Sequence, residues 1–359
     1  MESIQRQAER GEMEAISITP KPYLTGKVVV LNGLSGCGKT MLSPIIGALP
    51  RVELMQYSYV LEYVCQLKYL GRIETDVASA LTGLITDLHL YNIMMGRETN
   101  FRPADLSSVF RNPRPMRYFL RLFQAGDEAV INRGQVERPI LLLTTHNLLP
   151  ISLPLFEALG PRVLFVELVR HPLYRIIQHS IAMEREQFET GGNSRSFLIM
   201  FEYKGVRLPW FAYGWEEVFL TASPIEKAIY VMDYMTKQAE RLGVFGAGYG
   251  RDDVLVIPFE RFVIDPLPYM RRLETALSTK MDSCTRRMMR KQKVPRKMYA
   301  EGIDLERYKQ YGWEPPEKNS NEAKEFERRR QFAAERASPE AMEILDQLCV
   351  DYEAKYLKK

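Results

Sequence analysis

The sequence GLSGCGKT, from Gly33 to Thr40, limits what this chain can fold into more than any other segment does. Its spacing is G-x-x-x-x-G-K-[ST], the pattern of a loop whose backbone N–H groups surround a phosphate. The apolar run 28–31 precedes the loop and predicts a strand that is buried on both faces. A helix starting near Lys39 adds its positive end to the phosphate site. The segment predicts a strand, a phosphate-binding loop and a helix, but it does not distinguish a nucleoside triphosphate from another phosphate donor.

Further apolar runs along the chain predict more strands, and helical patterns separate these runs. The predicted strands cover residues 27–31, 52–57, 138–146, 161–172 and 252–260. Strands that alternate with helices predict an α/β fold in which helices flank a parallel sheet, here of the P-loop nucleotide-binding type. Such folds bind ligands at the carboxyl ends of their strands, which is where Gly33, His146 and Arg170 emerge.

The helical patterns and the chain length predict one large domain. The predicted helices include residues 39–48, a long helical region up to about Met95, and residues 225–243, which Gly243 ends. A chain of 359 residues with 46% hydrophobic content can bury a large core. We expect residues 1–24 to form a loose arm and residues 25–359 to form a single domain with a helical extension from about 300 to 359.

Charge and cysteine usage limit the classes of partner. A net charge of +4 is too small to indicate nucleic-acid binding, but it allows a polyanionic ligand held by a few cations. The four cysteines have no metal-ligand spacing and indicate free thiols in a reducing compartment; they are Cys37, Cys65, Cys284 and Cys349. The polar N-terminus does not resemble a signal peptide, and no apolar run has the length of a membrane span. We therefore expect a soluble, cytoplasmic protein that is not integral to a membrane.

Two residues at predicted strand ends are candidates for chemistry. His146 can accept a proton from an attacking hydroxyl group, or it can serve only to satisfy backbone groups at a strand end. Arg170 can clamp a second phosphate with its planar guanidinium, or it can form an ion pair with Glu167. Each alternative is compatible with the position of the residue in the sequence.

Two further segments have a structural and a functional interpretation. The basic segment 290–297 is either a solvated surface or a loop that folds over a dinucleotide-like donor. The aromatic segment 197–219 belongs partly to the core, and the rest of it can line a pocket for an acceptor that carries a hydroxyl group.

Three segments together resemble the sulfotransferases that use 3′-phosphoadenosine 5′-phosphosulfate, over most of residues 27–297. RPILLLTTHNLLP is similar to the family's strand that ends in Lys-Thr-His, and LFVELVRHPLYRIIQHS is similar to its 3′-phosphate motif. VLVIPFERFVIDPLPYMRRLETAL is similar to the strand and helix of its YED…DP segment. The chain differs at four places: Gly36 and Thr144 replace family lysines, Gln178 stands where a serine is expected, and Phe259 replaces a tyrosine.

The resemblance implies sulfuryl transfer to a hydroxyl or amine of a small-molecule or saccharide acceptor, without a metal. His146 is then the general base, and Lys39 stabilises the leaving phosphate. The implied donor-binding residues are Ser35, Gly36, Cys37, Gly38, Lys39, Thr40, Met41, Arg170, Gln178 or Ser180, Arg296 and Lys297. The resemblance names neither the acceptor, which can be a saccharide, a lipid or a phenol, nor the oligomeric state.

The alternative function is that of a P-loop kinase or nucleotide hydrolase that uses ATP and magnesium. Lys39 and Thr40 have the arrangement that binds a magnesium triphosphate, and Glu167 is the candidate carboxylate at a neighbouring strand end. A non-catalytic nucleotide-binding module is a third class, but it leaves His146 without a role. We favour the sulfotransferase because Thr-His and Arg-x-Pro fall at successive strand ends.

Overall fold

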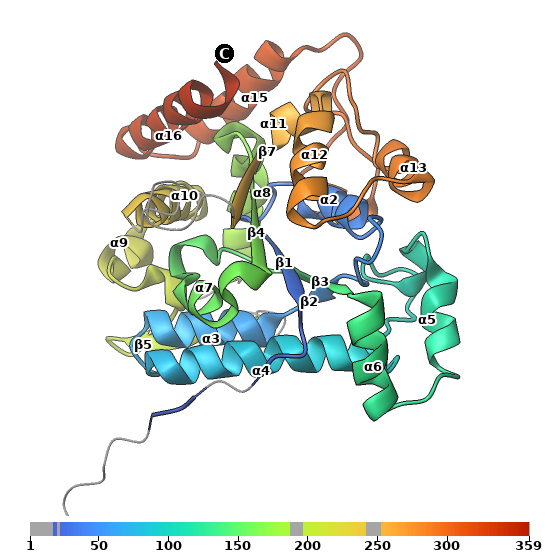
Figure 1. Cartoon of the computed structure of the whole chain (residues 1–359). Coiled ribbons are helices and arrows are strands. Elements are labelled where there is room, and N and C mark those ends of the chain that lie inside the picture. Colours follow the sequence, from blue (N-terminus) through green and yellow to red (C-terminus); the bar gives the residue numbers. More distant parts are fainter. Residues whose placement is uncertain (1–16, 20–21, 187–196, 242–252, 359) are drawn as a thin grey trace, which may run out of the picture.

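The computed structural model describes residues 17–19, 22–186, 197–241 and 253–358, and its centre is a five-stranded parallel sheet (Figure 1). The strands, in their order across the sheet, are β2 (Gln56–Tyr57), β3 (Ile140–Thr144), β1 (Lys27–Asn32), β4 (Val163–Val169) and β7 (Val254–Pro258). β1 lies in the middle and pairs in parallel with β3 and β4. Apolar side chains bury these strands on both faces, as the continuous apolar runs predict. The predicted α/β fold with a parallel sheet is confirmed.

Alternate residues of β1 feed two hydrophobic cores, because successive side chains of a strand point to opposite faces. Val28 and Val30 belong to a core that the helices on one face complete. These helices are α3 (Tyr59–Tyr69), α4 (Thr75–Met94), α7 (Leu153–Leu159) and α10 (Pro224–Arg241). Figure 1 shows α3, α4 and α7 together on this face of the sheet.

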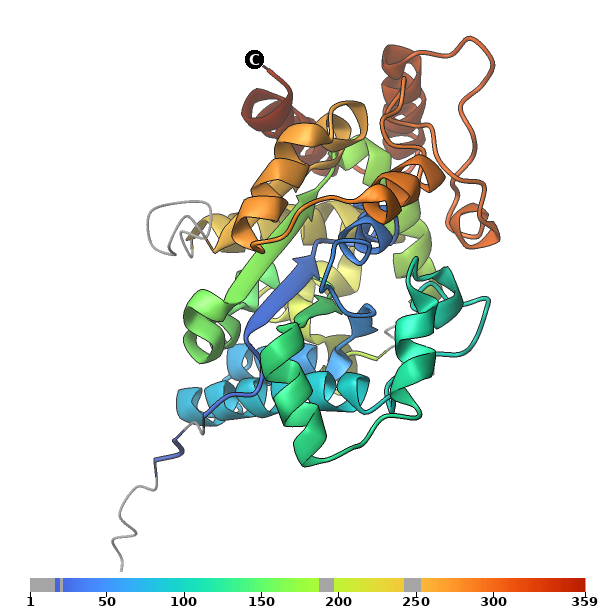
Figure 2. The same cartoon turned by 45° about the vertical axis from the view of Figure 1, so that its right-hand side comes forward.

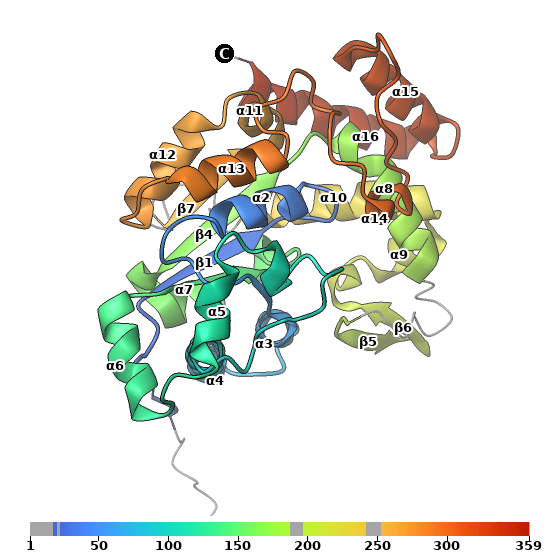
Figure 3. The same ribbon diagram turned by 90° about the vertical axis from the view of Figure 1, so that its right-hand side faces the viewer.

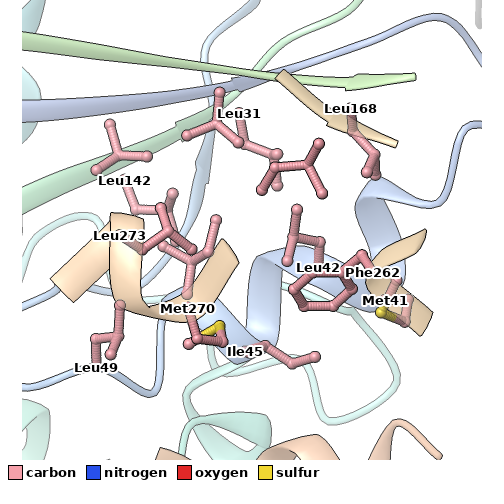
Figure 4. Close-up of a cluster of buried hydrophobic side chains, with 14 of the residues drawn as sticks. Leu31, Met41, Leu42, Ile45, Leu49, Leu142, Leu168, Phe262, Met270 and Leu273 are labelled. Carbon is pink, nitrogen blue, oxygen red and sulfur yellow. The ribbon is translucent and has the colours of Figure 1, made fainter. Parts of the chain in front are cut away.

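Val29 and Leu31 point to the other face and pack under the helix that follows the glycine-rich loop. The helices here are α2 (Lys39–Ile46), α11 (Phe259–Ile264), α12 (Leu267–Ala276) and α13 (Ser283–Lys291). Figure 4 shows Leu42 and Ile45 of α2 beside Met270 of α12, and in Figure 2 the orange helices α12 and α13 lie beside the blue helix α2. This core fixes the loop against the sheet.

The C-terminal helices cover one side of the sheet's carboxyl end. α15 (Glu322–Ala334) and α16 (Pro339–Tyr352) pack on α8 (Pro172–Glu186), as Figure 3 shows. Ile176, Ile229 and Leu345 are buried in the core that α8, α10 and α16 share. A short π-helix, η6 (Glu353–Leu357), ends the described chain, and the Arg261 side chain donates a hydrogen bond to the Tyr356 carbonyl at 3.0 Å.

Shorter elements complete the described chain. They are η1 (Val109–Arg111), α5 (Pro115–Arg121), α6 (Glu128–Glu137), η2 (Leu149–Ile151), η3 (Gly160–Arg162), β5 (Met200–Tyr203), β6 (Val206–Pro209), η5 (Trp210–Ala212), α9 (Glu216–Thr221) and α14 (Glu306–Lys309). β5 and β6 form an antiparallel hairpin outside the main sheet. Within the described ranges, no helix combines the length and the apolar character that crossing a membrane requires.

The predicted strand over 52–57 is much shorter than its sequence pattern indicates. The segment forms only an isolated bridge, between Val52 and Ile140, and the short strand β2. Glu53 lies between the bridge and β2; it is buried, and its carboxylate pairs with Arg117 and Arg121. Burial raises the pKa of Glu53, but the two arginines outweigh it and hold the pKa below its usual value. This ionised cluster holds the segment by side-chain contacts where strand pairing stops.

Two helical predictions also change at their ends. The long helical region up to about Met95 is two helices, α3 and α4, joined by a turn in which Gly71 has a φ of 66°. The helix predicted over 225–243 is α10, which begins one residue earlier at Pro224. Its predicted end at Gly243 lies outside the described residues.

Candidate functional site

A cavity of about 250 Å³ lies at the carboxyl ends of the strands, and we call it the loop cleft. Its lining includes residues 35–41 of the glycine-rich loop, together with His146, Arg170, Gln178 and Arg296. A larger cavity of about 1070 Å³ opens at the amino ends of β1 and β3, at the end of the sheet opposite to the loop. Because parallel sheets present ligands at the carboxyl ends of their strands, the loop cleft is the candidate site.

Two glycines allow the loop to close tightly against its neighbours. Gly36 and Gly38 have φ angles of 78° and 106°, which other residues rarely adopt. A Cβ atom on Gly38 would lie 2.5 Å from the Phe259 ring, and a Cβ atom on Gly36 would lie 2.8 Å from Gln178 Oε1. The loop therefore packs against α11 and α8, and α2 begins behind it at Lys39. The free amides at the start of α2 give this wall a positive potential.

The Lys39 side chain folds back over the loop. Its ammonium group donates hydrogen bonds to the carbonyl oxygens of Gly33 and Leu34, the second at 3.4 Å. The residue is buried although it lines the cleft. The loop thus holds a cation at its centre through backbone carbonyls, and these partners are weak enough for an anion to replace them.

Two arginines face the same aromatic ring beside the loop. The Arg170 guanidinium lies 4.2 Å from the centre of the Phe259 ring, and the Arg296 guanidinium lies 5.4 Å from it. Arg170 Nη1 donates to the Gly36 carbonyl at 2.9 Å, while Arg296 Nε donates to the Lys293 carbonyl at 3.0 Å. Burial, and then the charge of Arg170, lower the pKa of Arg296 to about 10, so Arg296 stays charged at neutral pH. The hydrogen bond to the loop, and not an ion pair with Glu167, positions Arg170.

Of the two candidates on α8, Gln178 lines the loop cleft and Ser180 lies outside its lining. Residues two apart on a helix point about 200° from each other, so one turn cannot present both to the same cleft. Ser180 is buried instead. Lys297 also lies outside the lining; it is exposed, and its backbone N–H donates to Glu301 Oε2 at 3.0 Å.

A buried carboxylate orients His146. Glu62 Oε1 accepts hydrogen bonds from the His146 backbone N–H at 3.1 Å and from ring Nδ1 at 3.0 Å. The Glu62 side chain is only 2% exposed, whereas that of His146 is 31% exposed. Because Nδ1 donates to the carboxylate, Nε2 is left as the acceptor nitrogen on the exposed side of the ring. The arrangement suits a general base.

Aromatic rings gather around His146. The ring of Tyr57 lies 6.3 Å and that of Tyr59 lies 6.0 Å from the imidazole, each nearly parallel to it. Phe197, which is 54% exposed, lies 5.4 Å from Tyr59. The other aromatic residues of segment 197–219 include Trp210, which is buried in the core. Only the first part of that segment therefore contributes to an aromatic surface near His146.

The far wall of the cleft comes from a segment that carries no recognised motif. Tyr308, Tyr311 and Trp313 line it, next to Gln292. Arg329 of α15 is not part of this lining, and its guanidinium lies 4.8 Å from the Tyr174 ring. Burial, and then the charge of Arg170, lower the pKa of Arg329 to about 10. The helical pattern of the C-terminal region gives no signal that these residues reach the loop.

Glu167, the candidate metal ligand, does not line the loop cleft. It is buried and accepts a hydrogen bond from Asn32 Nδ2 at 2.7 Å, and Asn32 in turn accepts one from Thr145. Burial raises the pKa of Glu167 to about 7. Across the described ranges, no group of three or more His, Cys, Asp or Glu side chains is arranged to hold a metal ion.

Comparison with known proteins gave solved structures only, since no protein-family model and no curated protein matches this chain. The chain is similar to the sulfotransferase domain of the olefin synthase of Synechococcus PCC 7002. The identity is 12%, the TM-score is 0.39, and 89% of this chain and 98% of that one are covered. It is also similar to sulfotransferase STF1 of Mycobacterium tuberculosis H37Rv, with 12% identity, a TM-score of 0.37, and 74% of this chain and 71% of that one covered. For sulfotransferase STF9 of Mycobacterium avium the identity is 14%, the TM-score is 0.37, and 75% of this chain and 68% of that one are covered. All three are sulfotransferases, the family that the sequence motifs resemble.

Proposed function

We propose that this chain is a sulfotransferase that moves a sulfuryl group from 3′-phosphoadenosine 5′-phosphosulfate to the hydroxyl group of a small aromatic acceptor. The observation that carries the proposal is the pair Arg170 and Arg296, whose guanidinium groups face one ring, Phe259, beside the loop. A nucleotide with one chain of phosphates places all of them at the loop. A donor with a second, separate phosphate also needs cations away from the loop.

The residues of the cleft fit such a donor. The amides of residues 35–40 hold the 5′-phosphosulfate, and the Lys39 ammonium lies beside them. Arg170, Arg296 and the Gln178 amide hold the 3′-phosphate, which offsets the repulsion between the two partly buried guanidinium groups. The rings of Tyr311 and Trp313 give the adenine base a surface for stacking.

The reaction needs a base and a stabilised leaving group. The donor supplies the sulfuryl group: the acceptor oxygen forms a bond to sulfur while the bond from sulfur to the 5′-phosphate oxygen breaks. His146 Nε2 takes the proton of the acceptor hydroxyl, and the Glu62 carboxylate stabilises the imidazolium that forms. Lys39 leaves the Gly33 carbonyl and donates to the oxygen on which negative charge develops.

The surface beside His146 favours a flat acceptor. Tyr57 and Tyr59 present rings next to the imidazole, and Phe197 lies beside Tyr59; such rings stack on an aromatic compound. A phenol that lies against them directs its hydroxyl group toward Nε2. We therefore place phenols before saccharides among the acceptors that the sequence leaves open.

A kinase or nucleotide hydrolase explains Lys39 and Thr40 equally well, but two other features fit it less well. Glu167, its candidate magnesium ligand, is hydrogen-bonded to Asn32 away from the loop cleft. The Arg170 and Arg296 guanidinium groups face one ring beside the loop, and a separate second phosphate accounts for this pair more directly than a linear triphosphate does.

The test is a direct comparison of donors with the purified full-length chain. One reaction contains 2-naphthol and the donor labelled on sulfur, and the other contains 2-naphthol, magnesium and ATP labelled on the γ-phosphate. We expect label in naphthyl sulfate and a matching amount of adenosine 3′,5′-bisphosphate. Transfer or release of the γ-phosphate instead, with no sulfuryl transfer, would contradict the proposal.

A further inference from the structure

A second cavity, of about 180 Å³, lies behind the glycine-rich loop on the face of the sheet that α10 covers. We call it the α10 cavity. Its walls come from the ends of β1 and β4, the segment after β3, helices α8, α10 and α16, and the π-helix η6. Arg170 is the one residue that lines both this cavity and the loop cleft. The α10 cavity is therefore a separate space that the sulfuryl-transfer proposal leaves without a role.

A buried arginine lines the α10 cavity. Arg175 of α8 is 7% exposed, and its Nε donates to the Ser35 carbonyl at 3.4 Å. Its Nη2 has no hydrogen-bond partner within the described residues. Burial lowers the pKa of Arg175 to about 10, so the guanidinium remains charged at neutral pH. A buried cation with an unused donor is costly unless an anion meets it.

The acidic group in the same cavity does not fill this role. Glu167 lines the α10 cavity, but its carboxylate is engaged with Asn32 at 2.7 Å. Because burial raises the pKa of Glu167 to about 7, it is only partly ionised at neutral pH. Arg170 adds a second positive charge to the same wall. Arg170, Arg175 and Glu167 together thus carry a net positive charge.

Buried apolar side chains form one part of the α10 cavity. Met232, Met235 and Ala239 of α10 and Leu149 are each at most 4% exposed and line it. Asp233 and Lys237 in the lining form an ion pair at 2.8 Å. The lining also has three exposed charged residues, Glu240, Asp351 and Lys355, so its exposed part carries charges of both signs. The cavity therefore combines an apolar wall with a buried cation, Arg175.

We propose that the α10 cavity binds a small monocarboxylate with an apolar chain, whose carboxylate accepts a hydrogen bond from Arg175 Nη2. A single free donor beside an acidic side chain suits a monoanion better than a phosphate dianion. The apolar walls take up the hydrocarbon part, which removes it from water. No bond is made or broken at this site.

Calorimetry with sodium hexanoate tests this site, and 1-hexanol and hexylammonium chloride serve as probes of the same length. We expect one hexanoate to bind per chain, about tenfold or more tightly than either probe. Saturating adenosine 3′,5′-bisphosphate should change the Kd of hexanoate by less than about threefold, because the α10 cavity and the loop cleft share only one lining residue. Absence of hexanoate binding, equal binding of the three probes, or loss of hexanoate binding in the bisphosphate would each overturn the proposal.

Two variants place the ligand within the α10 cavity. Arg175→Met should weaken hexanoate about tenfold or more while 1-hexanol binds as before, which shows that the cavity is intact. Ala239→Leu fills the cavity and should weaken the binding of both hexanoate and 1-hexanol. The matched variant Ala334→Leu, at an exposed position of α15, should weaken the binding of neither compound. Unchanged hexanoate binding in Arg175→Met or in Ala239→Leu would overturn the assignment. Should either variant not fold, the comparison of the three probes on the natural chain still decides it.

Discussion

The carboxylate of Glu62 accepts two hydrogen bonds from one residue, His146: one from the backbone N–H at 3.1 Å and one from ring Nδ1 at 3.0 Å. The first bond fixes where the backbone leaves β3, and the second fixes the ring and its tautomer. Because Glu62 is buried on α3, its charge is screened little by solvent and acts mainly on this imidazole. Glu62 is therefore a positioning residue, and His146 is the group placed to touch the acceptor.

We predict that His146→Ala lowers turnover by about 10²–10⁴-fold, the range that a positioned base contributes. Binding of adenosine 3′,5′-bisphosphate, measured by calorimetry, should be unchanged because the ring faces the acceptor side. The rate should also lose the acid-side decrease that protonation of the base causes. Near-normal turnover would show that the base lies elsewhere, and loss of the cooperative melt would show that His146 is structural.

Glu62→Gln should lower kcat by about tenfold to 100-fold and change KM for the acceptor much less. The glutamine amide occupies the same space, but it cannot stabilise the imidazolium that forms during transfer. If kcat is unchanged in Glu62→Gln, the charge of Glu62 does not act on His146 and the residue has only a structural role. Glu62→Asp, which keeps the charge, should restore part of the activity.

Lys39→Ala should lower kcat by about 100-fold and change donor affinity by less than about tenfold. In the structure the Lys39 ammonium is already satisfied by the Gly33 and Leu34 carbonyls, so it gains little from ground-state binding. Stopped-time assays at saturating donor separate the two effects. Weakened donor binding with unchanged turnover at saturation would contradict a role in transfer.

Gly38→Ala should destabilise the fold by about 3 kcal/mol and abolish bisphosphate binding, because its Cβ would meet the Phe259 ring at 2.5 Å. Gly71→Ala is the matched control: Gly71 also has a positive φ, of 66°, but nothing lies within 4 Å of the added Cβ. The control should cost only about 1 kcal/mol and leave binding intact. Denaturant unfolding and calorimetry measure both, and equal costs would show that contact with Phe259 does not constrain the loop.

Glu167→Gln should stabilise the protein at pH 8 by up to about 3 kcal/mol relative to pH 5. The carboxyl ionises near 4.5 when exposed and near 7 in the fold, since burial raises its pKa. The folded state therefore binds the proton more tightly, and stability is lost as pH rises from about 4.5 through about 7. Glutamine at position 167 removes this loss of stability. The control Glu343→Gln, at an exposed position of α16, should give no gain in stability at pH 8 relative to pH 5. Equal gains at the two pH values would contradict the assignment.

The strand, loop and helix around Gly33–Thr40 could be predicted because their signals are local: an apolar run, glycines at fixed spacing and a lysine at the helix start. The ends of β3 and β4 followed from the same kind of run. They place His146 and Arg170 on one edge of the sheet, since parallel strands share their carboxyl end.

The rest of the site depends on contacts between distant segments, which no short pattern records. Tyr311 and Trp313 line the cleft although they lie far along the chain from the glycine-rich loop. Glu62 is hidden within a helical pattern, and only tertiary contact shows that its carboxylate meets His146. Helical periodicity alone predicts that Gln178 and Ser180 do not face the same cleft, because residues two apart on a helix point to different sides.

The central claim is that the loop cleft holds a nucleotide with two separate phosphate groups, and calorimetry with adenosine 3′,5′-bisphosphate against ADP tests it most directly. We predict that the bisphosphate binds about tenfold or more tightly than ADP, without dependence on magnesium. Arg170→Ala should remove this preference by weakening the bisphosphate alone, and Arg102→Ala, whose side chain is 83% exposed, should not change it. Equal or tighter binding of ADP that requires magnesium would contradict the account and identify a kinase or nucleotide hydrolase.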